Sequence, residues 1–195
     1  PVATLEGLSH LLKRELTQTG DGLFGHLEDT ISKLRNQNQV LLELAHVNEV
    51  SVAPGLVLLE DIVRNSLGER IETVDLSLNL QSQEITTDAL LLTIIFKNLF
   101  DNAFLFSEQK PKVEIDFQCD GSFYSLNFRD YGSGIKEDLR EKVFDMFFKG
   151  SDKSKGSGLG LYLTRKAVEK MNGEIEVITP SGRGTKFHIV LPMPK

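Results

Sequence analysis

Residues 98–103 read N-L-F-D-N-A and lie inside an apolar-periodic segment that runs from Asp88 to Phe106. A helix over this segment would place Asn98 and Asn102, four residues apart, on one face. Carboxamide oxygens can ligate a hard cation, and magnesium needs few protein oxygens because it keeps most of its water and phosphate ligands. The two amides are therefore chemically suited to Mg-ATP.

Two glycine-containing motifs follow along the chain. D-Y-G-S-G at 130–134 comes after a strand-like run. Asp130 can accept a hydrogen bond from an exocyclic amine such as adenine N6, while Gly132 and Gly134 let the backbone approach a flat ring. G-S-G-L-G-L at 156–161 precedes a helical pattern, and a helix N-terminus offers phosphate free N–H groups and a positive dipole end. The three motifs predict one nucleotide site.

The motifs resemble those of a known family, the sensor histidine kinases of the GHKL superfamily, which also holds gyrase, a heat-shock chaperone and mismatch-repair ATPases. N-L-F-D-N-A resembles the N box, D-Y-G-S-G the G1 box, V-F-D-M-F-F at 143–148 the F box and G-S-G-L-G-L the G2 box. The stretch G-R-G-T-K-F-H-I-V-L-P at 182–192 resembles the closing strand, whose threonine, here Thr185, stands near the adenine-binding aspartate. Four boxes in the right order make a chance match improbable.

The resemblance implies a set of site residues. Asn98 would take part in catalysis and would bind Mg²⁺ together with Asn102. Residues 142–155 would form an ATP lid, with phenylalanines at its base and Lys149, Lys153 or Lys155 touching phosphates; the alternative is a solvated loop. The nucleotide-contacting residues would be Asn102, Asp130, Gly132, Gly134, Phe144, Phe147, Lys149, Lys155, Gly156, Gly158, Leu159, Gly160 and Thr185.

The boxes depart from the family pattern at a few positions. The N box is followed by Leu105 and Phe106, where kinases of this type often carry Lys and Tyr, so that one phosphate contact is missing. Either Lys97 or a lid lysine replaces it, or nucleotide affinity and the transfer rate are reduced. The G1 box has Tyr131 and Ser133 where Asn and Pro are frequent, which leaves its aspartate and glycines in place.

Composition places the chain among ordinary globular proteins. It has 195 residues, 40% of them hydrophobic, and a net charge of −6, which argues against broad binding to nucleic acid or anionic membranes. We see no apolar run of about 18 residues and no signal-like start, so we expect no membrane segment and a cytoplasmic location, as a whole protein or as the cytoplasmic part of a larger sensor. The single cysteine, Cys119, fits a core position.

The first fifty residues have a different pattern from the rest. Helical spacing predicts helices over about 4–17 and 23–48, interrupted by T-Q-T-G-D-G at 17–22. A monomeric hairpin could not fully bury the apolar stripe of the second helix. S-V-A-P-G at 51–55 marks a break. We therefore predict domains at 1–50 and 51–195, the first a helical dimerisation and phosphotransfer region that forms a dimeric four-helix bundle. The stripe consists of Leu27, Ile31, Leu34, Leu41, Leu44 and Val47.

The second domain is predicted to be α+β, a two-layer α/β sandwich with a mixed sheet and helices. Helices are expected at 56–66, 87–107, 136–143 and 157–171, and strands at 70–80, 112–119, 122–129, 174–179 and 184–191.

The phosphoacceptor is sought in S-H-L-L-K-R-E-L-T at 9–17, which resembles the H box. Leu11 stands where an acid normally follows the histidine and Glu15 where proline is expected, although Glu6 could supply the acid from one turn earlier. The spacing from His10 to the end of the second helix is also shorter than in the family. His10 is thus one candidate, and an H box before residue 1 is the other. His26 is a weaker candidate, and His46 and His188 are expected to be structural.

These observations lead to a functional hypothesis. The chain would be the ATP-dependent protein histidine kinase core of a two-component system, passing the γ-phosphoryl of Mg-ATP to a histidine and then to a response regulator aspartate. Its expected partners are the receiver domain of that regulator and a second copy of itself, joined through residues 1–50, with no nucleic acid. The alternatives are a phosphotransfer or scaffold protein with a decayed ATP site, and another GHKL-type kinase or ATPase.

Overall fold

The computed structural model describes residues 21–150, 157–178 and 184–194 and divides into two compact units, Pro1–Glu43 and Leu44–Lys195. The described part of the first unit belongs to helix α2 (Asp21–Glu49), which confirms the predicted second helix. In the stripe of this helix, Leu27, Leu34 and Leu41 are exposed while Ile31 is buried. The predicted helix over 4–17, with His10, lies outside the described residues. Within the described ranges, no helix combines the length and hydrophobicity needed to cross a membrane.

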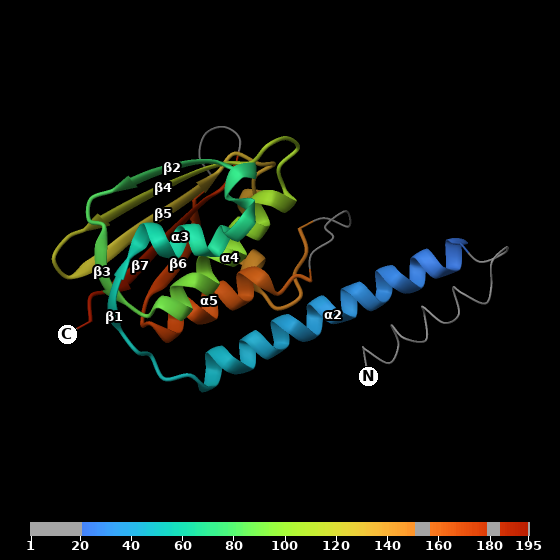
Figure 1. The fold of residues 1–195 in the computed structure, drawn as a ribbon, viewed down its shortest axis with the longest axis horizontal. Coiled ribbons are helices and arrows are strands. Elements are labelled where there is room, and N and C mark those ends of the chain that lie inside the picture. Colours follow the sequence, from blue (N-terminus) through green and yellow to red (C-terminus); the bar gives the residue numbers. More distant parts are fainter. Residues whose placement is uncertain (1–20, 151–156, 179–183, 195) are drawn as a thin grey trace. The chain divides into compact units, whose positions relative to one another are not determined.

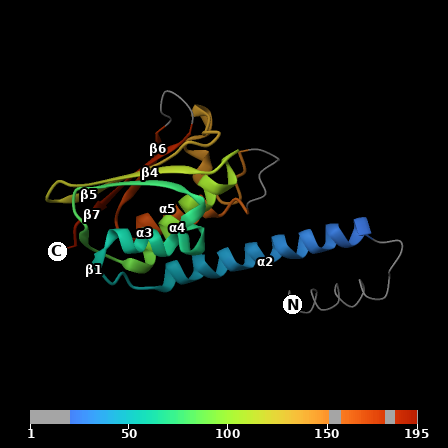
Figure 2. The ribbon, with the colours of Figure 1, turned by 45° about the horizontal axis from the view of Figure 1, so that its top comes forward.

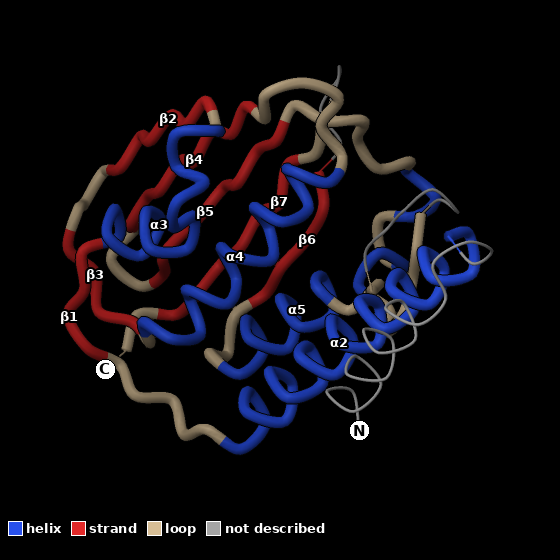
Figure 3. Tube along the Cα trace, turned by 45° about the vertical axis from the view of Figure 1, so that its right-hand side comes forward, coloured by secondary structure: helices blue, strands red, loops and turns tan. Residues whose placement is uncertain are grey.

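The second unit is built on a mixed five-stranded sheet with the order β2-β4-β5-β7-β6 (Figures 1 and 3). Strands β2 and β4 are parallel, and the other neighbours are antiparallel. Side chains alternate between buried and exposed along β4 and β5, as expected when one face of a sheet is covered. The strands are β2 (Asp75–Leu80), β4 (Lys112–Cys119), β5 (Phe123–Asp130), β6 (Glu174–Ile178) and β7 (Lys186–Pro192).

Three helices cover one face of this sheet, which gives the predicted α+β two-layer sandwich (Figure 2). They are α3 (Leu59–Leu67), α4 (Ala89–Leu105) and α5 (Gly160–Lys170). Phe100 of α4 packs edge-on against Phe128 of β5, with ring centroids 5.1 Å apart, and both rings are fully buried. Helix α4 is apolar on most of its surface because it lies between the sheet and its two neighbouring helices.

Helix α4 starts at a well-formed cap. Asp88 accepts a hydrogen bond from Leu91 N through Oδ1 at 2.9 Å, and its Oδ2 accepts one from Ala53 N at 2.8 Å. The buried carboxylate therefore satisfies a free N–H group of the first turn and also fixes the segment that leads into the domain. This fixed start sets the position of the asparagines further along the helix.

Some of the elements predicted from the sequence differ from the structure in their start or in their type. The helix expected at 56–66 starts at Leu59, because Gly55–Leu58 forms strand β1, which pairs with β3 (Glu84–Thr87) in a separate two-stranded sheet. The strand expected at 70–80 begins at Asp75, because Gly68–Thr73 forms a 3₁₀ turn. The helix expected at 136–143 is two short 3₁₀ turns, Glu137–Leu139 and Lys142–Phe144. Short apolar runs fit a strand or a helix equally well until their partners are known.

Candidate nucleotide-binding site

The two asparagines of the N-L-F-D-N-A motif lie on successive turns of α4 but have different surroundings. Asn98 is 8% exposed, and its Nδ2 donates to Ile94 O at 2.9 Å. That bond leaves Oδ1 directed at α5, where a β carbon added to Gly160 would lie 3.0 Å from it. Asn102 is half-buried, and its buried Nδ2 has no hydrogen-bond partner among the described residues. An unpaired buried amide is costly, which marks Asn102 as a group that suits a ligand.

Asp130 stands at the end of β5 and is held by the chain that leads into β7. Its Oδ1 accepts from Gly132 N at 2.9 Å and from Thr185 N at 3.2 Å. The two backbones also exchange hydrogen bonds, from Asp130 N to Thr185 O and from Thr185 N to Asp130 O. A residue 55 positions away in sequence thus orients the carboxylate.

Asp130 is 6% exposed, and this burial raises the pKa of its carboxylate above the ordinary value of about 3.9. Hydrogen bonds from the backbone of Gly132 and Thr185, and from the Thr185 hydroxyl, oppose the shift. The folded state disfavours the charged carboxylate, so Asp130 lowers the free energy of unfolding. This destabilisation is complete above the raised pKa and decreases as the pH falls through that pKa. A buried acceptor that costs stability without a ligand is suited to receive a donor from one.

The glycines of this region permit close backbone contacts. A β carbon on Gly132 would lie 2.8 Å from Phe106 O, the carbonyl that accepts from Ser133 N at 3.1 Å. The turn after β5 therefore packs directly against the C-terminal end of α4. Gly134 has φ of 78° and faces Gly184 O, where a β carbon would be 3.0 Å away.

Gly184 is a site residue that the sequence interpretation did not single out. Its φ is 97°, and a β carbon there would overlap Asp130 O. The signal was present, because Gly184 directly precedes Thr185 at the entrance to a predicted strand. Only a glycine lets this segment approach the aspartate closely enough to pair with it.

The third motif forms the start of α5. Leu159, the N-cap residue, is buried and, among the described residues, has no side-chain cap for the first turn of the helix. Its own N–H donates to Ser157 Oγ at 3.3 Å. Gly160 begins the helix beside Asn98 of α4. The free N–H groups and the positive end of the helix dipole face the region of Asn98, which creates a favourable environment for an anion.

The segment with the F-box pattern lies against the start of α5. Phe144 is fully buried, packs against Phe187 with centroids 6.5 Å apart, and carries the guanidinium of Arg165 4.1 Å above its ring. Phe147 is 51% exposed and has a φ of 65°. A β carbon on Gly158 would lie 2.7 Å from the backbone of 147–148, so the two segments touch along their main chains.

The remaining predicted contacts are spread out. Lys149 is exposed at the end of the F-box segment, and Leu105 is 39% exposed where the family often has a lysine. Lys153, Lys155 and Gly156 lie outside the described residues, as does His10. His188, on β7, pairs through Nδ1 with Asn127 Oδ1 at 2.9 Å on the face of the sheet away from the helices.

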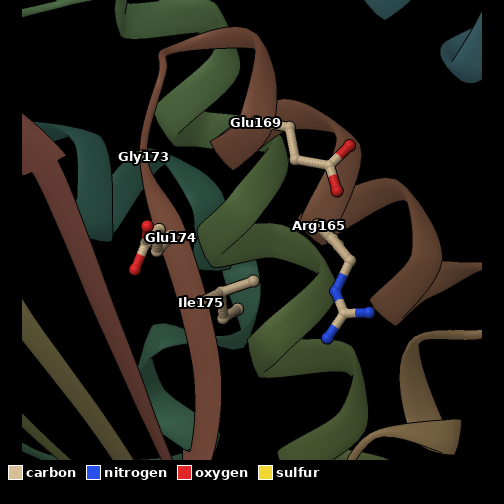
Figure 4. Close-up of a pocket in the computed structure, with 5 residues that line it drawn as sticks. All are labelled: Arg165, Glu169, Gly173, Glu174 and Ile175. Atoms are coloured by element: carbon tan, nitrogen blue, oxygen red, sulfur yellow. The ribbon is translucent and has the colours of Figure 1, made fainter.

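A separate pocket of about 270 Å³ lies between α5 and β6 (Figure 4). Arg165 and Glu169 line it from α5, and Gly173, Glu174 and Ile175 line it from the turn before β6 and the start of that strand. Arg165 is already paired with Glu141 at 3.3 Å. All five lining residues lie outside the three nucleotide motifs, so this pocket is distinct from the candidate site.

The mixed sheet, the buried aspartate at the end of β5 and the glycine turn before α5 together define a nucleotide-binding α/β sandwich. The family model of the histidine kinase-, DNA gyrase B-, and HSP90-like ATPases matches residues 87–195, and the chain belongs to this family. The domain is therefore an ATP-binding domain.

Individual relatives agree with this assignment. The methanogenesis regulatory histidine kinase FilI of Methanothrix harundinacea is 28% identical over all of this chain, which spans 23% of that protein. The solved mycobacterial sensor histidine kinase MprB is 28% identical with a TM-score of 0.62, covering 72% of this chain and 98% of its own. The structure of histidine kinase ThkA in complex with response regulator TrrA is 18% identical with a TM-score of 0.71, covering 100% of this chain and 58% of its own.

Proposed function

We propose that this chain is the catalytic core of an ATP-dependent protein histidine kinase of a two-component system. The observation that carries the proposal is the convergence of α4, the end of β5 and the start of α5. Asn98 faces Gly160, and Gly132 faces the end of α4, so that all three motifs border one region. The names of the relatives support a histidine as the acceptor of the phosphoryl group.

The base of ATP would bind at Asp130. The buried carboxylate would accept from the adenine N6 amine, and Thr185 and Gly132 would hold it in place through the bonds to Oδ1. Gly132 and Gly134 have no side chain that could stand between the ring and the backbone.

The phosphates would bind at the start of α5, between Gly158, Gly160 and the amides of α4. Magnesium would neutralise phosphate charge there, held by Asn98 and Asn102 together with phosphate and water oxygens. The Nδ2 of Asn102, unpaired among the described residues, fits this role, because the amide could donate to a metal-bound water while its Oδ1 would ligate Mg²⁺. Lys149, Lys153 or Lys155 would act on the phosphates as point charges.

We expect Asn102→Ala to weaken binding of ATP about tenfold in the presence of Mg²⁺ and to have little effect in EDTA, because its contribution passes through the metal. Isothermal titration calorimetry under both conditions measures this difference. Asn127→Ala is the matched control, since Asn127 lies on the opposite face of the sheet and bonds to His188. An equal loss with and without Mg²⁺ would contradict the metal role of Asn102.

The chain's own residues contribute positioning and electrostatics to the transfer. An imidazole nitrogen would attack the γ-phosphorus in line as the bond to the oxygen bridging the β- and γ-phosphates breaks, and ADP would leave. The phosphohistidine would then be attacked by a response regulator aspartate. ThkA, which has the same fold as this chain, forms a complex with the response regulator TrrA, and this complex supports such a partner. Residues 1–50 would join two copies, because the leucines exposed on α2 need a partner.

Incubation with γ-labelled Mg-ATP tests the activity. The label should be labile in acid and stable in alkali, and mass spectrometry under neutral conditions should locate it. His10→Gln should abolish it if His10 is the acceptor, whereas the control His46→Gln, on the exposed surface of α2, should not. Undiminished labelling of His10→Gln would reject His10.

A chain that binds ATP and never labels itself would point to an acceptor histidine outside these residues. A separate fragment carrying an H box should then restore transfer. If no label is transferred to that fragment either, the result would favour the alternative of a scaffold protein with a decayed site.

A further inference from the structure

Tyr131 belongs to the G1 motif but points away from the nucleotide side. Asp130, the last residue of β5, is buried under the helices, whereas Tyr131, the residue after the strand, contacts Lys112 and Glu114 of β4. Tyr131 therefore reaches the outer face. Its hydroxyl donates to Oε2 of Glu114, on the neighbouring strand β4, at 2.6 Å.

Two cations complete this cluster. Lys112 Nζ and the guanidinium carbon of Arg129 each lie 4.6 Å from the centroid of the Tyr131 ring. Lys112 is also paired with Glu114 Oε1 at 3.2 Å. Arg129 stands opposite Glu114 in the register of the two strands, and its buried Nε has no hydrogen-bond partner among the described residues. Lys112, Glu114, Arg129 and Tyr131 thus form one connected group, called here the outer cluster.

The hydrogen bonds of the outer cluster shift the pKa values of Glu114, Tyr131 and Lys112 in the directions that keep each group in its bonded protonation state. The hydrogen bond with Tyr131 is the largest cause that lowers the pKa of Glu114, and the same bond raises the pKa of Tyr131. The bond to Glu114 raises the pKa of Lys112. At neutral pH the carboxylate is therefore ionised, and the phenol and the ammonium keep their protons. Each group is in the form that the hydrogen bonds and cation contacts require.

The backbone of Tyr131 connects the outer cluster to the site. Tyr131 is the single residue between Asp130 and Gly132, and Gly132 N donates to the carboxylate of Asp130. The Cα of Tyr131 would be 2.8 Å from a β carbon on Gly184. The main chain at Tyr131 therefore also packs against the segment that carries Thr185. A shift of Tyr131 would move both the carboxylate and the donors that orient it.

We propose that Tyr131 is a positioning residue, which the outer cluster holds so that the Asp130 carboxylate points at the adenine ring. This inference rests on the proposed function, because it assumes that the base binds at Asp130. It also gives a role to the tyrosine that departs from the usual G1 pattern. The cluster acts from the face of the sheet opposite the nucleotide, through the backbone of a single residue.

Binding of ADP and GDP by calorimetry and competition separates positioning from folding. GDP lacks the N6 amine from which the Asp130 carboxylate would accept a hydrogen bond. We expect Tyr131→Ala to weaken ADP binding about tenfold with little change for GDP, and Tyr131→Phe, which keeps the ring under the cations, to cause a smaller loss of the same kind. The matched control is Tyr124→Phe, which removes the hydroxyl of a tyrosine on β5 that accepts from Thr86 N at 3.1 Å. It should leave both affinities unchanged.

The free energy of unfolding of each variant is measured alongside by urea titration. Equal losses for ADP and GDP, or a loss of stability with unchanged ADP affinity in Tyr131→Ala, would overturn the inference and leave the proposed function intact. Failure of the unaltered chain to bind ADP would contradict the proposed function, and this inference with it.

Discussion

The Asp130→Asn variant is expected to bind ATP about 10- to 150-fold more weakly than the unaltered chain, which corresponds to the roughly 1.5–3 kcal/mol of a hydrogen bond to a charged group. The amide oxygen can still accept from Gly132 N and Thr185 N, so the fold should persist. The substitution replaces a pure acceptor with a group that can also donate, which mismatches the adenine amine. Isothermal titration calorimetry measures the change.

Asp116→Asn provides the control for this variant. Asp116 lies on β4, where its Oδ1 accepts from Asn79 Nδ2 at 3.1 Å, and it is remote from the three nucleotide motifs. The charge change is the same, so a general electrostatic effect would appear in both variants. An unchanged affinity in Asp130→Asn would exclude Asp130 as the contact to the base.

Gly184→Ala is expected to destabilise the domain by about 2–5 kcal/mol and to remove measurable nucleotide binding, because a left-handed backbone angle and a backbone clash act together. The β carbon would overlap Asp130 O, and neither partner is a side chain that can rotate away. Relief would require separating Thr185 from Asp130, which breaks their reciprocal hydrogen bonds. Urea unfolding followed by circular dichroism gives the free energy of unfolding.

Gly121→Ala separates the two causes. Gly121 has φ of 88°, close to that of Gly184, but a β carbon there would have no atom within 4 Å among the described residues. This variant should show the cost of the backbone angle without the clash, and it should bind nucleotide normally. Equal effects of the two substitutions would mean that the close approach at Gly184 contributes nothing.

The elements with a regular pattern were predictable from the sequence. Strand β4 was predicted with the bounds that the structure has, and its partner β5 was displaced by one residue, because strict alternation and the turn at Gly121 specify both strands. Helix α4 was predicted within two residues of each end, since its cap Asp88 precedes a long apolar run. In these segments local chemistry and tertiary packing favour the same structure.

The parts that could not be predicted depend on distant partners. Strand β1 is an apolar run whose conformation is set by pairing with β3, and Leu56 on it is 70% exposed, so no burial pattern marks it as a strand. The family resemblance placed Thr185 near Asp130, but the hydrogen bonds that join them connect positions 55 residues apart, which no local pattern specifies. The motifs identified Asp130 as a candidate, whereas the need for glycine at 184 follows from the close approach of its backbone to Asp130 O, a contact between segments distant in sequence.

The pairing of β5 with β7 also bears on when the domain can first work during synthesis. Asp130 leaves the ribosome long before Thr185, and the intervening chain includes all of α5 and β6. A nascent chain that has folded β4, β5 and α4 still lacks the segment that orients the carboxylate. Contacts between distant residues form late because a long loop must close first. Nucleotide capture should therefore coincide with completion of the last strand, so that no partly made domain competes for cellular ATP.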